Sequence, residues 1–242
     1  MGAVKKYLER AERILIGGHR GCRCGFPENS IEAMEEGIKR GADYLEIDIQ
    51  LSADKVPVVI HDVRMEEKTA LSGYVHEHNF QELKEAVPGL CTLKEALTWG
   101  RGRDVCFALE MKTVPLEMQA WNMELAELTG ALLYKTGMTD QVFVFGPDYQ
   151  VLKHLKDFYR DVNIGLIVPF VPEDPVELMR RMEAVVYLSY IYNMTPEIIQ
   201  DLQKNGYFVS GAILRDEYWV KRAVECGVNM FETDEPERYA FR

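Results

Sequence analysis

The sequence predicts a TIM (β/α)8 barrel, the α/β fold in which eight parallel strands alternate with helices and close into a cylinder. Apolar runs of strand length recur along the 242 residues, and stretches with helical spacing of apolar residues separate most of them. Several of those stretches end in glycine, as helices often do. Such alternation implies parallel strands joined by crossover helices, and at this length an open doubly wound sheet is the other solution.

Nine runs are candidate strands, one more than the barrel needs. The run at 56–62 follows the run at 44–50 after a connection around SADK, which is too short for a parallel crossover. We therefore expect these two runs to pair antiparallel as a hairpin, which leaves eight strands for the barrel. In chain order the runs are 14–18, 44–50, 56–62, 104–112, 141–146, 162–168, 184–190, 206–214 and 228–234.

Helical spacing predicts connecting helices between most of these strands, but the segment 63–91 differs. Its periodicity is weak and it ends close to Pro88 and Gly89. We expect it to form a small insertion at the barrel rim after the second strand, within one domain that covers residues 1–242. The helical stretches are 30–41, 115–137, 148–160, 195–206 and 216–227.

The composition favours an ordinary globular protein and disfavours a nucleic-acid partner. The formal net charge is −11 and the pI is about 5.0, whereas proteins that bind polyanions usually present a basic face. No stretch approaches the roughly eighteen uninterrupted apolar residues of a membrane span, and residues 1–18 lack the apolar core of a signal peptide. We expect a cytoplasmic protein without stable membrane insertion.

The cysteines form an odd and scattered set, which suits reduced thiols better than a disulfide framework. Cys22 and Cys24 stand close together, yet without a second close pair they fall short of a zinc motif. The five are Cys22, Cys24, Cys91, Cys106 and Cys226.

Acidic side chains gather on two predicted strands. Because side chains alternate along a strand, Glu46 and Asp48 share one face of the run at 44–50, and Glu110 and Lys112 share one face of a later run. Two unit charges about 4 Å apart repel by roughly 4 kcal/mol at an effective dielectric near 20. Three acids at a barrel mouth therefore require a cation, and oxygen ligands favour Mg²⁺, Ca²⁺ or Mn²⁺ over zinc. The alternative for Glu46 and Asp48 is the exposed polar face of an edge strand.

Two histidines and two cations are expected beside these acids. His19 ends the first predicted strand and His61 ends the hairpin, so both imidazoles are suited to a general acid and base pair. For either histidine alone, a hydrogen-bonded structural role is the alternative. Arg20 and Lys112 indicate an anionic substrate, and a phosphate group matches these donors best.

The order of these elements resembles the signature of the glycerophosphodiester phosphodiesterase family. The residues that carry the resemblance are HRGCRCGFPENS at 19–30, ADYLEIDIQLSADKVPVVIHD at 42–62 and LEMK at 109–112. CTLKEAL at 91–97 and GVNMFETDEP at 227–236 resemble later parts of the family pattern, so the resemblance spans nearly the whole chain.

The resemblance implies a metal-dependent phosphodiesterase that hydrolyses small-molecule glycerophosphodiesters to sn-glycerol 3-phosphate and an alcohol, in glycerol and lipid metabolism. It also implies that the substrate's glycerol hydroxyl attacks phosphorus to give a cyclic phosphate, which water then opens. The implied roles are one divalent cation, Mg²⁺ or Ca²⁺, held by Glu46, Asp48 and Glu110; acid and base catalysis by His19 and His61; and phosphate binding by Arg20 and Lys112.

The second half of the chain departs from the family pattern. Phe145-Gly146 stands where family members often carry Ser-Phe, and 212–215 stands where they carry a Trp-Thr-x-Asn run. Trp219 or the cluster of Tyr187, Tyr190 and Tyr192 is the candidate replacement for the missing pocket wall. The alcohol group, the native ion and the oligomeric state are therefore open.

Two other readings compete with hydrolysis of glycerophosphodiesters. One is a phospholipase that resembles sphingomyelinase D and stops at a cyclic phosphate. The other is a catalytically silent barrel that binds a phosphorylated metabolite. In the first loop, Asn29 with Glu32 has the form of a helix N-cap and its reciprocal partner. Glu28 is either an acid favoured by a helix N-terminus, which is the interpretation we prefer, or a residue that touches the site.

Overall fold

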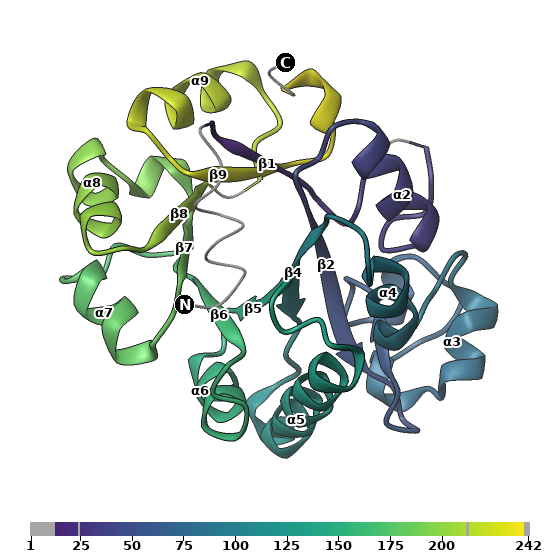
Figure 1. The fold of residues 1–242 in the computed structure, drawn as a ribbon. Helices are drawn as coiled ribbons and strands as arrows, with labels where there is room; N and C mark the ends of the chain where they lie inside the picture. The colour runs from purple at the N-terminus through teal and green to yellow at the C-terminus, as the bar shows by residue number, and fades with distance from the viewer. Residues whose placement is uncertain (1–12, 24, 212, 240–242) are drawn as a thin grey trace.

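The computed structural model describes residues 13–23, 25–211 and 213–239, which form a closed barrel surrounded by helices (Figure 1). Its sheet has the order β1-β9-β8-β7-β6-β5-β4-β2-β3, and β1 pairs with both β9 and β2, so the ring is closed. The predicted TIM barrel is therefore confirmed. The predictions that involve residues 1–12, Cys24 and Ala212 lie outside the described residues.

Each of the nine predicted runs contains one observed strand. β3 pairs antiparallel with β2, as expected for the hairpin, and the other eight strands pair in parallel. The strands are β1 (Leu15–Gly18), β2 (Tyr44–Leu51), β3 (Pro57–Val59), β4 (Cys106–Met111), β5 (Val142–Gly146), β6 (Asn163–Ile167), β7 (Val186–Ser189), β8 (Phe208–Gly211) and β9 (Met230–Thr233).

The helices form a ring outside the strands (Figure 1). Several begin at a capping side chain: Asp148, Asp174, Thr195 and Asp216 each accept a hydrogen bond from a backbone N–H of the first turn. The helices are α2 (Ile31–Lys39), α3 (Phe80–Ala86), α4 (Leu93–Gly100), α5 (Gln119–Thr136), α6 (Tyr149–Phe158), α7 (Pro175–Met182), α8 (Pro196–Lys204) and α9 (Glu217–Cys226).

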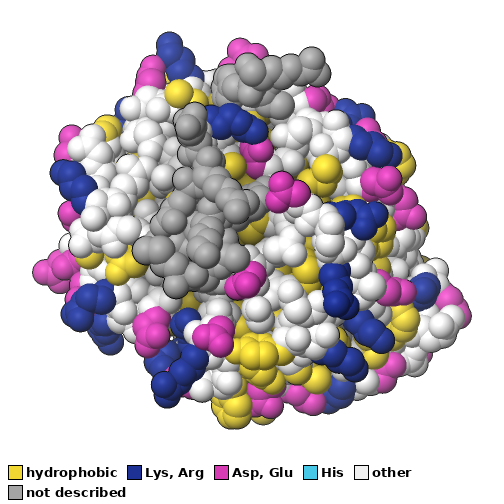
Figure 2. Space-filling model, in the orientation of Figure 1, with side chains coloured by type: hydrophobic (Ala, Val, Ile, Leu, Met, Phe, Trp, Pro, Cys, Tyr) yellow, Lys and Arg dark blue, Asp and Glu magenta, His cyan; other side chains and the backbone are white. Residues whose placement is uncertain are grey.

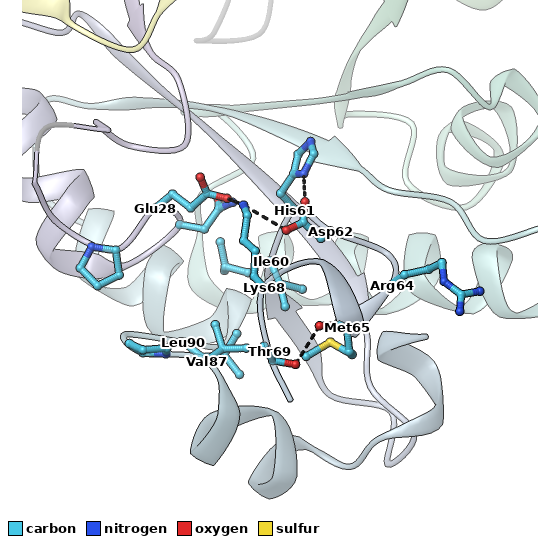
Figure 3. A pocket seen from close by; sticks show the side chains of 14 residues that line it. Glu28, Ile60, His61, Asp62, Arg64, Met65, Lys68, Thr69, Val87 and Leu90 are labelled. Atoms are coloured by element: carbon cyan, nitrogen blue, oxygen red, sulfur yellow. Dashed lines mark hydrogen bonds and ion pairs between the residues drawn. The ribbon is translucent and has the colours of Figure 1, made fainter. Parts of the chain in front are cut away.

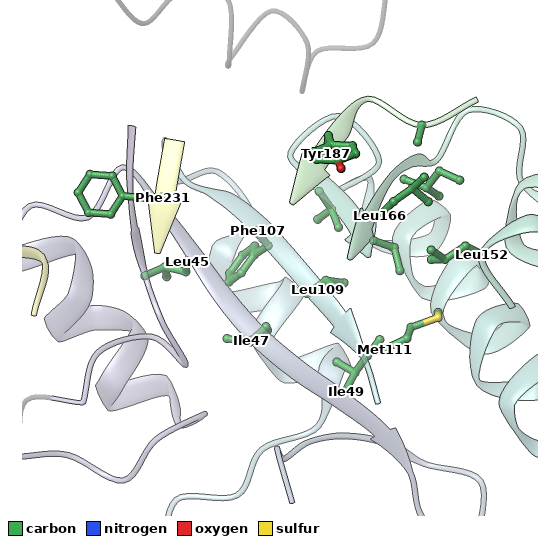
Figure 4. Packing of buried hydrophobic residues seen from close by; sticks show 14 of the residues in the cluster. Leu45, Ile47, Ile49, Phe107, Leu109, Met111, Leu152, Leu166, Tyr187 and Phe231 are labelled. Carbon is green, nitrogen blue, oxygen red and sulfur yellow. The ribbon is translucent and has the colours of Figure 1, made fainter. Parts of the chain in front are cut away.

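Side-chain alternation along the strands separates two layers of the core. Ile47 of β2 and Leu109 of β4 belong to the layer between strands and helices (Figure 4). Their neighbours in sequence point the other way, into the barrel, where Tyr44, Ala108 and Phe145 pack together. The same period of two places the acids of β2 and β4 inside the barrel.

The segment 63–91 packs over the outer side of β3 and has an apolar cluster of its own. It contains two short 3-10 helices, Met65–Glu67 and Val75–Glu77, followed by α3. Its cluster consists of Val58, Ile60, Met65, Val75, Leu83 and Leu90.

On the face shown in Figure 2, acidic and basic side chains are intermixed around the periphery. None of the described helices is long and apolar enough to cross a bilayer.

The cysteines correct one expectation. Cys91, Cys106 and Cys226 are buried free thiols, but Cys22 is disulfide-bonded, so the prediction of a reduced thiol there is wrong. Count and spacing did not reveal this, because disulfide formation depends on how close two Cβ atoms come in space.

Candidate active site

The residues predicted for the site meet at the end of the barrel where the parallel strands finish. β1 pairs with β2 and β2 pairs with β4, so side chains from the three strand ends lie beside one another. The set comprises His19 and Arg20 after β1, Glu46 and Asp48 in β2, His61 after β3, Glu110 in β4 and Lys112 after β4.

The three acids form a compact cluster. Carboxylate oxygens of Glu46, Asp48 and Glu110 all lie within 4.8 Å of one another. Asp48 and Glu110 are direct neighbours in the β2–β4 register, and Glu46 and Asp48 are each only 1% exposed. The edge-strand alternative for Glu46 and Asp48 is therefore wrong, because β2 pairs on both sides and its acids face the barrel interior.

Burial and mutual repulsion perturb these acids strongly. Burial, followed by the charges of Asp48, Glu232 and Glu110, raises the pKa of Glu46 well above its ordinary value. Burial and the charge of Asp48 likewise raise the pKa of Glu110. Burial also opposes ionisation of Asp48, but Lys112, His61 and a hydrogen bond from Asn29 hold its pKa below the ordinary value.

Cationic side chains partly compensate this acidic cluster. The Lys112 ammonium lies 2.5 Å from Glu110 Oε1 and 3.1 Å from Asp48 Oδ1. Arg20 Nε lies 3.7 Å from Asp48 Oδ2, while the Arg20 backbone N–H donates to Glu46 Oε2 at 2.7 Å. Arg20 and Lys112 therefore both lie in ion-pair range of Asp48.

The acids fit a hard divalent cation. The buried Oε1 of Glu46 has no hydrogen-bond partner among the described residues, although an ionised oxygen out of water needs a donor or a cation. An all-carboxylate donor set is one that Mg²⁺ and Ca²⁺ accept. One such ion among Glu46, Asp48 and Glu110 would relieve the repulsion that burial leaves in place.

Each histidine is held by a carboxylate. His19 Nδ1 lies 2.6 Å from Asp234 Oδ1, and His61 Nδ1 lies 2.6 Å from Asp62 Oδ1. Hydrogen bonds from His19 and Arg215 overcome the effect of burial and keep the pKa of Asp234 well below its ordinary value. An ionised carboxylate only accepts, so Nδ1 of His19 is the protonated nitrogen and Nε2 is left for other partners.

Both imidazoles follow strands at the same end of the barrel as the cluster, and each interacts electrostatically with Asp48. The charge of His61 lowers the pKa of Asp48, and the charge of Asp48 raises the pKa of His19. Burial nevertheless dominates at His19 and lowers its pKa below 6.5. Burial therefore favours the neutral form of His19, which is the form that accepts a proton.

Asn29 positions Asp48 and does not cap α2. The Asn29 amide donates to Asp48 Oδ2 at 2.8 Å, and the Asp48 backbone N–H donates to Asn29 Oδ1 at 3.1 Å. Ser30 is the N-cap, because its hydroxyl accepts from the backbone N–H of Ala33. The predicted cap at Asn29 is wrong, because its left-handed φ of 60° directs the side chain at β2.

Glu28 also belongs to the site and not to the first turn of α2. It accepts a hydrogen bond from Arg20 Nη1 at 2.8 Å and a second one from Lys68. Lys68 in turn lies 3.0 Å from Asp62, the carboxylate that holds His61. A chain of alternating charges therefore links the loops after β1 and β3.

Sequence reasoning also missed two acids, Glu232 in β9 and Asp234 directly after it. Asp234 holds His19, and Glu232 is buried in the barrel interior beneath the cluster. Burial, with the charges of Glu110 and Asp48, raises the pKa of Glu232 to about 8. The alternation of Met230, Glu232 and Asp234 was the available signal, since all three fall on the inward face.

The aromatic candidates for the missing pocket wall separate into two groups. Tyr187 belongs to the core between strands and helices, so it does not line the mouth. Tyr190 and Tyr192 follow β7, stack with ring centroids 5.1 Å apart and are 44% and 64% exposed. Trp219 meets Tyr192 edge-on at 6.0 Å.

Two histidines beside a cluster of three acids, at the mouth of a parallel barrel, form an arrangement suited to cleaving an anionic ester. Comparison with known proteins agrees and assigns the class: the protein is a phosphoric diester hydrolase. Residues 19–238 match the sequence profile of the glycerophosphoryl diester phosphodiesterase family, and the chain belongs to this family. The resemblance seen in the sequence is thereby confirmed.

Similarity to individual proteins extends over the whole barrel. A glycerophosphodiester phosphodiesterase of Caldanaerobacter subterraneus is 25% identical over 236 residues, which cover 93% of this chain and 96% of the relative. The fold matches a candidate glycerophosphoryl diester phosphodiesterase from Silicibacter pomeroyi with a TM-score of 0.88 at 20% identity, over 98% and 96% of the two chains. A phosphodiesterase from Oleispira antarctica, solved with its product sn-glycerol-3-phosphate, matches with a TM-score of 0.83 at 21% identity, over 93% and 94%.

Proposed function

We propose that the protein hydrolyses glycerophosphodiesters to sn-glycerol 3-phosphate and an alcohol. The observation that carries this proposal is the meeting of two carboxylate-held histidines and a buried cluster of three acids at one end of the barrel. Family membership and the product bound by the Oleispira antarctica phosphodiesterase support the same substrate class. The single domain over 1–242 and the cytoplasmic location remain predictions.

Glu46, Asp48 and Glu110 are the residues proposed to hold one divalent cation, Mg²⁺ or Ca²⁺. When bound, such an ion would polarise the phosphoryl oxygens and offset charge that develops on them. Arg20 and Lys112 would bind the remaining phosphoryl oxygens, since both already lie beside Asp48.

The histidines are proposed to divide the proton transfers between them. Burial favours the neutral form of His19, and Asp234 fixes its Nδ1, so Nε2 is free to accept the proton of the attacking hydroxyl. His61, fixed through Nδ1 by Asp62, would supply the proton that the leaving oxygen needs. The two carboxylates orient the rings and stabilise each imidazolium while it exists.

Product analysis tests the proposal. Glycerophosphoethanolamine is incubated with the purified protein in EDTA, and then with excess Mg²⁺ or Ca²⁺, and sn-glycerol 3-phosphate is measured with a coupled dehydrogenase. We expect product only with the added ion. A folded protein that releases no product with either ion would contradict the proposal, and phosphorus NMR that shows a persistent cyclic phosphate would favour the sphingomyelinase D-like reading.

A further inference from the structure

A cavity of about 320 Å³ lies between the loop after β1, the end of the β2–β3 hairpin and the segment 63–91 (Figure 3). Its volume is in the range of about 300–1,000 Å³ that is usual for small-molecule sites. Three of its lining residues, Glu28, Asn29 and His61, also contact the candidate active site, so the two spaces share a wall.

The two sides of this cavity differ in chemistry. In Figure 3 the Lys68 ammonium lies between the carboxylates of Glu28 and Asp62, on the side of His61. The far side is mainly aliphatic, and none of the described lining residues is Phe, Tyr or Trp. Two polar residues also line it, but the Arg64 guanidinium donates to Glu66 and the Thr69 hydroxyl donates to the Met65 carbonyl. The aliphatic lining consists of Pro27, Val59, Ile60, Met65, Val87, Pro88 and Leu90.

This lining indicates what the cavity is able to bind. An aliphatic wall offers no hydrogen bonds to the hydroxyls of a glycerol and no aromatic faces to a quaternary ammonium group. Lys68 is already paired with two carboxylates, which leaves it poorly suited to bind a further anion. An uncharged alkyl group is the ligand that gains most from this environment, because its burial costs no unpaired polar group.

We propose, building on the function proposed above, that this cavity receives the alcohol of the substrate and that this alcohol is aliphatic. His61 lines the cavity and His19 does not, which places the departing oxygen on the His61 side. As the attacking oxygen bonds to phosphorus, its proton passes to His19. The bond from phosphorus to the departing oxygen breaks, and that oxygen takes a proton from His61, so a neutral alcohol is released into the cavity.

A series of glycerophosphodiesters tests the proposal. The alcohols are ethanol, butanol and hexanol, and kcat/KM is measured for each with the wild type. Each CH₂ that enters the cavity is expected to raise kcat/KM about fourfold, the equivalent of about 0.8 kcal/mol. We expect at least a tenfold gain from ethyl to hexyl.

Variants inside and outside the cavity test whether the alkyl chain of the alcohol binds there. Val87→Phe fills the cavity and should remove the gain in kcat/KM from ethanol to hexanol, and Val87→Leu, a smaller addition, should halve that gain or more. Val224→Phe on α9, at an exposed position outside the cavity, is the matched control and should keep the full series.

The outcomes separate this inference from the proposed function. A flat series, with normal hydrolysis of the ethanol substrate, overturns the cavity assignment alone. A gain that survives Val87→Phe but is lost in Tyr192→Ser also overturns it, because the alcohol would then lie on the exposed tyrosines after β7. If no substrate is hydrolysed, the proposed function fails, and calorimetric binding of ethyl and hexyl phosphate in Mg²⁺ decides the inference: a tenfold preference for hexyl that Val87→Phe removes supports it, and equal affinity overturns it.

Discussion

Each histidine of the site is fixed through Nδ1 by a carboxylate, in one case a sequence neighbour and in the other a residue far along the chain. Asp62 is the neighbour of His61 in sequence, whereas Asp234 reaches His19 across 215 positions. A ring held in this way presents Nε2 in one orientation, which removes the rotational freedom that would otherwise slow proton transfer.

Removal of either imidazole should abolish most turnover. We expect His19→Ala and His61→Ala each to lower kcat roughly 10²–10⁴-fold, the usual contribution of a positioned acid or base. Far-UV circular dichroism should be unchanged. His154→Ala, a partly buried histidine on α6 whose imidazole contacts Glu127, is the control and should retain full activity.

Asp234 should set the pH dependence of His19. Because the hydrogen bond and charge of Asp234 raise the pKa of His19 against the larger effect of burial, Asp234→Asn should lower that pKa further. The acidic limb of kcat/KM, expected below pH 6.5 in the wild type, should move to lower pH, and kcat should fall at least roughly tenfold as the ring loses its orientation. An acidic limb that stays in place would argue against His19 as the base.

At the scale of elements, the β2–β4 pair brings the acids together. Their parallel register places Asp48 opposite Glu110, so one inward-facing row on two strands supplies the whole ligand set. Two strands that are buried in the sheet hold such a site more rigidly than loops would.

Glu46→Gln should lower the affinity for the cation, with little effect on activity once the ion is saturating. Loss of one charged oxygen should raise the Mg²⁺ concentration for half-maximal activity roughly tenfold, with activity recovered at saturating ion. Activity measured across a Mg²⁺ titration checks this. Glu117→Gln, an exposed acid before α5, provides the comparison and should leave the titration unchanged.

Glu232 of β9 should make the metal-free protein less stable as pH rises. Its pKa is about 8 in the folded protein against about 4.5 for an ordinary glutamate, so between these values the folded state binds the extra proton and stability falls with increasing pH. In EDTA, Glu232→Gln should therefore gain more in Tm at pH 8.5 than at pH 5, by roughly 2–4 °C, which about 1 kcal/mol produces in a chain of this size. Thermal melts at both pH values measure the difference, and an equal change at both would show that Glu232 does not titrate in this range.

The strands and the hairpin were predictable because short stretches of sequence determine them. Apolar runs of strand length located all nine strands, and the short connection after β2 identified the hairpin. Asn29 was misassigned because Asx residues at a helix start usually cap it, whereas here a left-handed backbone turns the side chain toward β2. Glu28 and Lys68 were not placed because their contact joins two loops that are distant in sequence.

At the scale of the whole molecule, the barrel mouth is divided into two chemically different sectors. The acids, cations and histidines come from β1 to β4, while exposed Tyr190 and Tyr192 follow β7 and exposed Phe170 follows β6. The first 112 residues carry nearly all of the recognisable chemistry, and the contribution of the second half depends on closure of the ring, which no local pattern reveals.

That closure occurs where β1 meets β9. During translation His19 is synthesised 215 residues before Asp234, so the hydrogen bond between them forms only after β9 has been made. Premature termination anywhere ahead of β9 would leave a polypeptide that retains its three acids and both imidazoles but has no means of orienting the first one. Orientation of His19 therefore requires a chain that has been translated through β9 and Asp234.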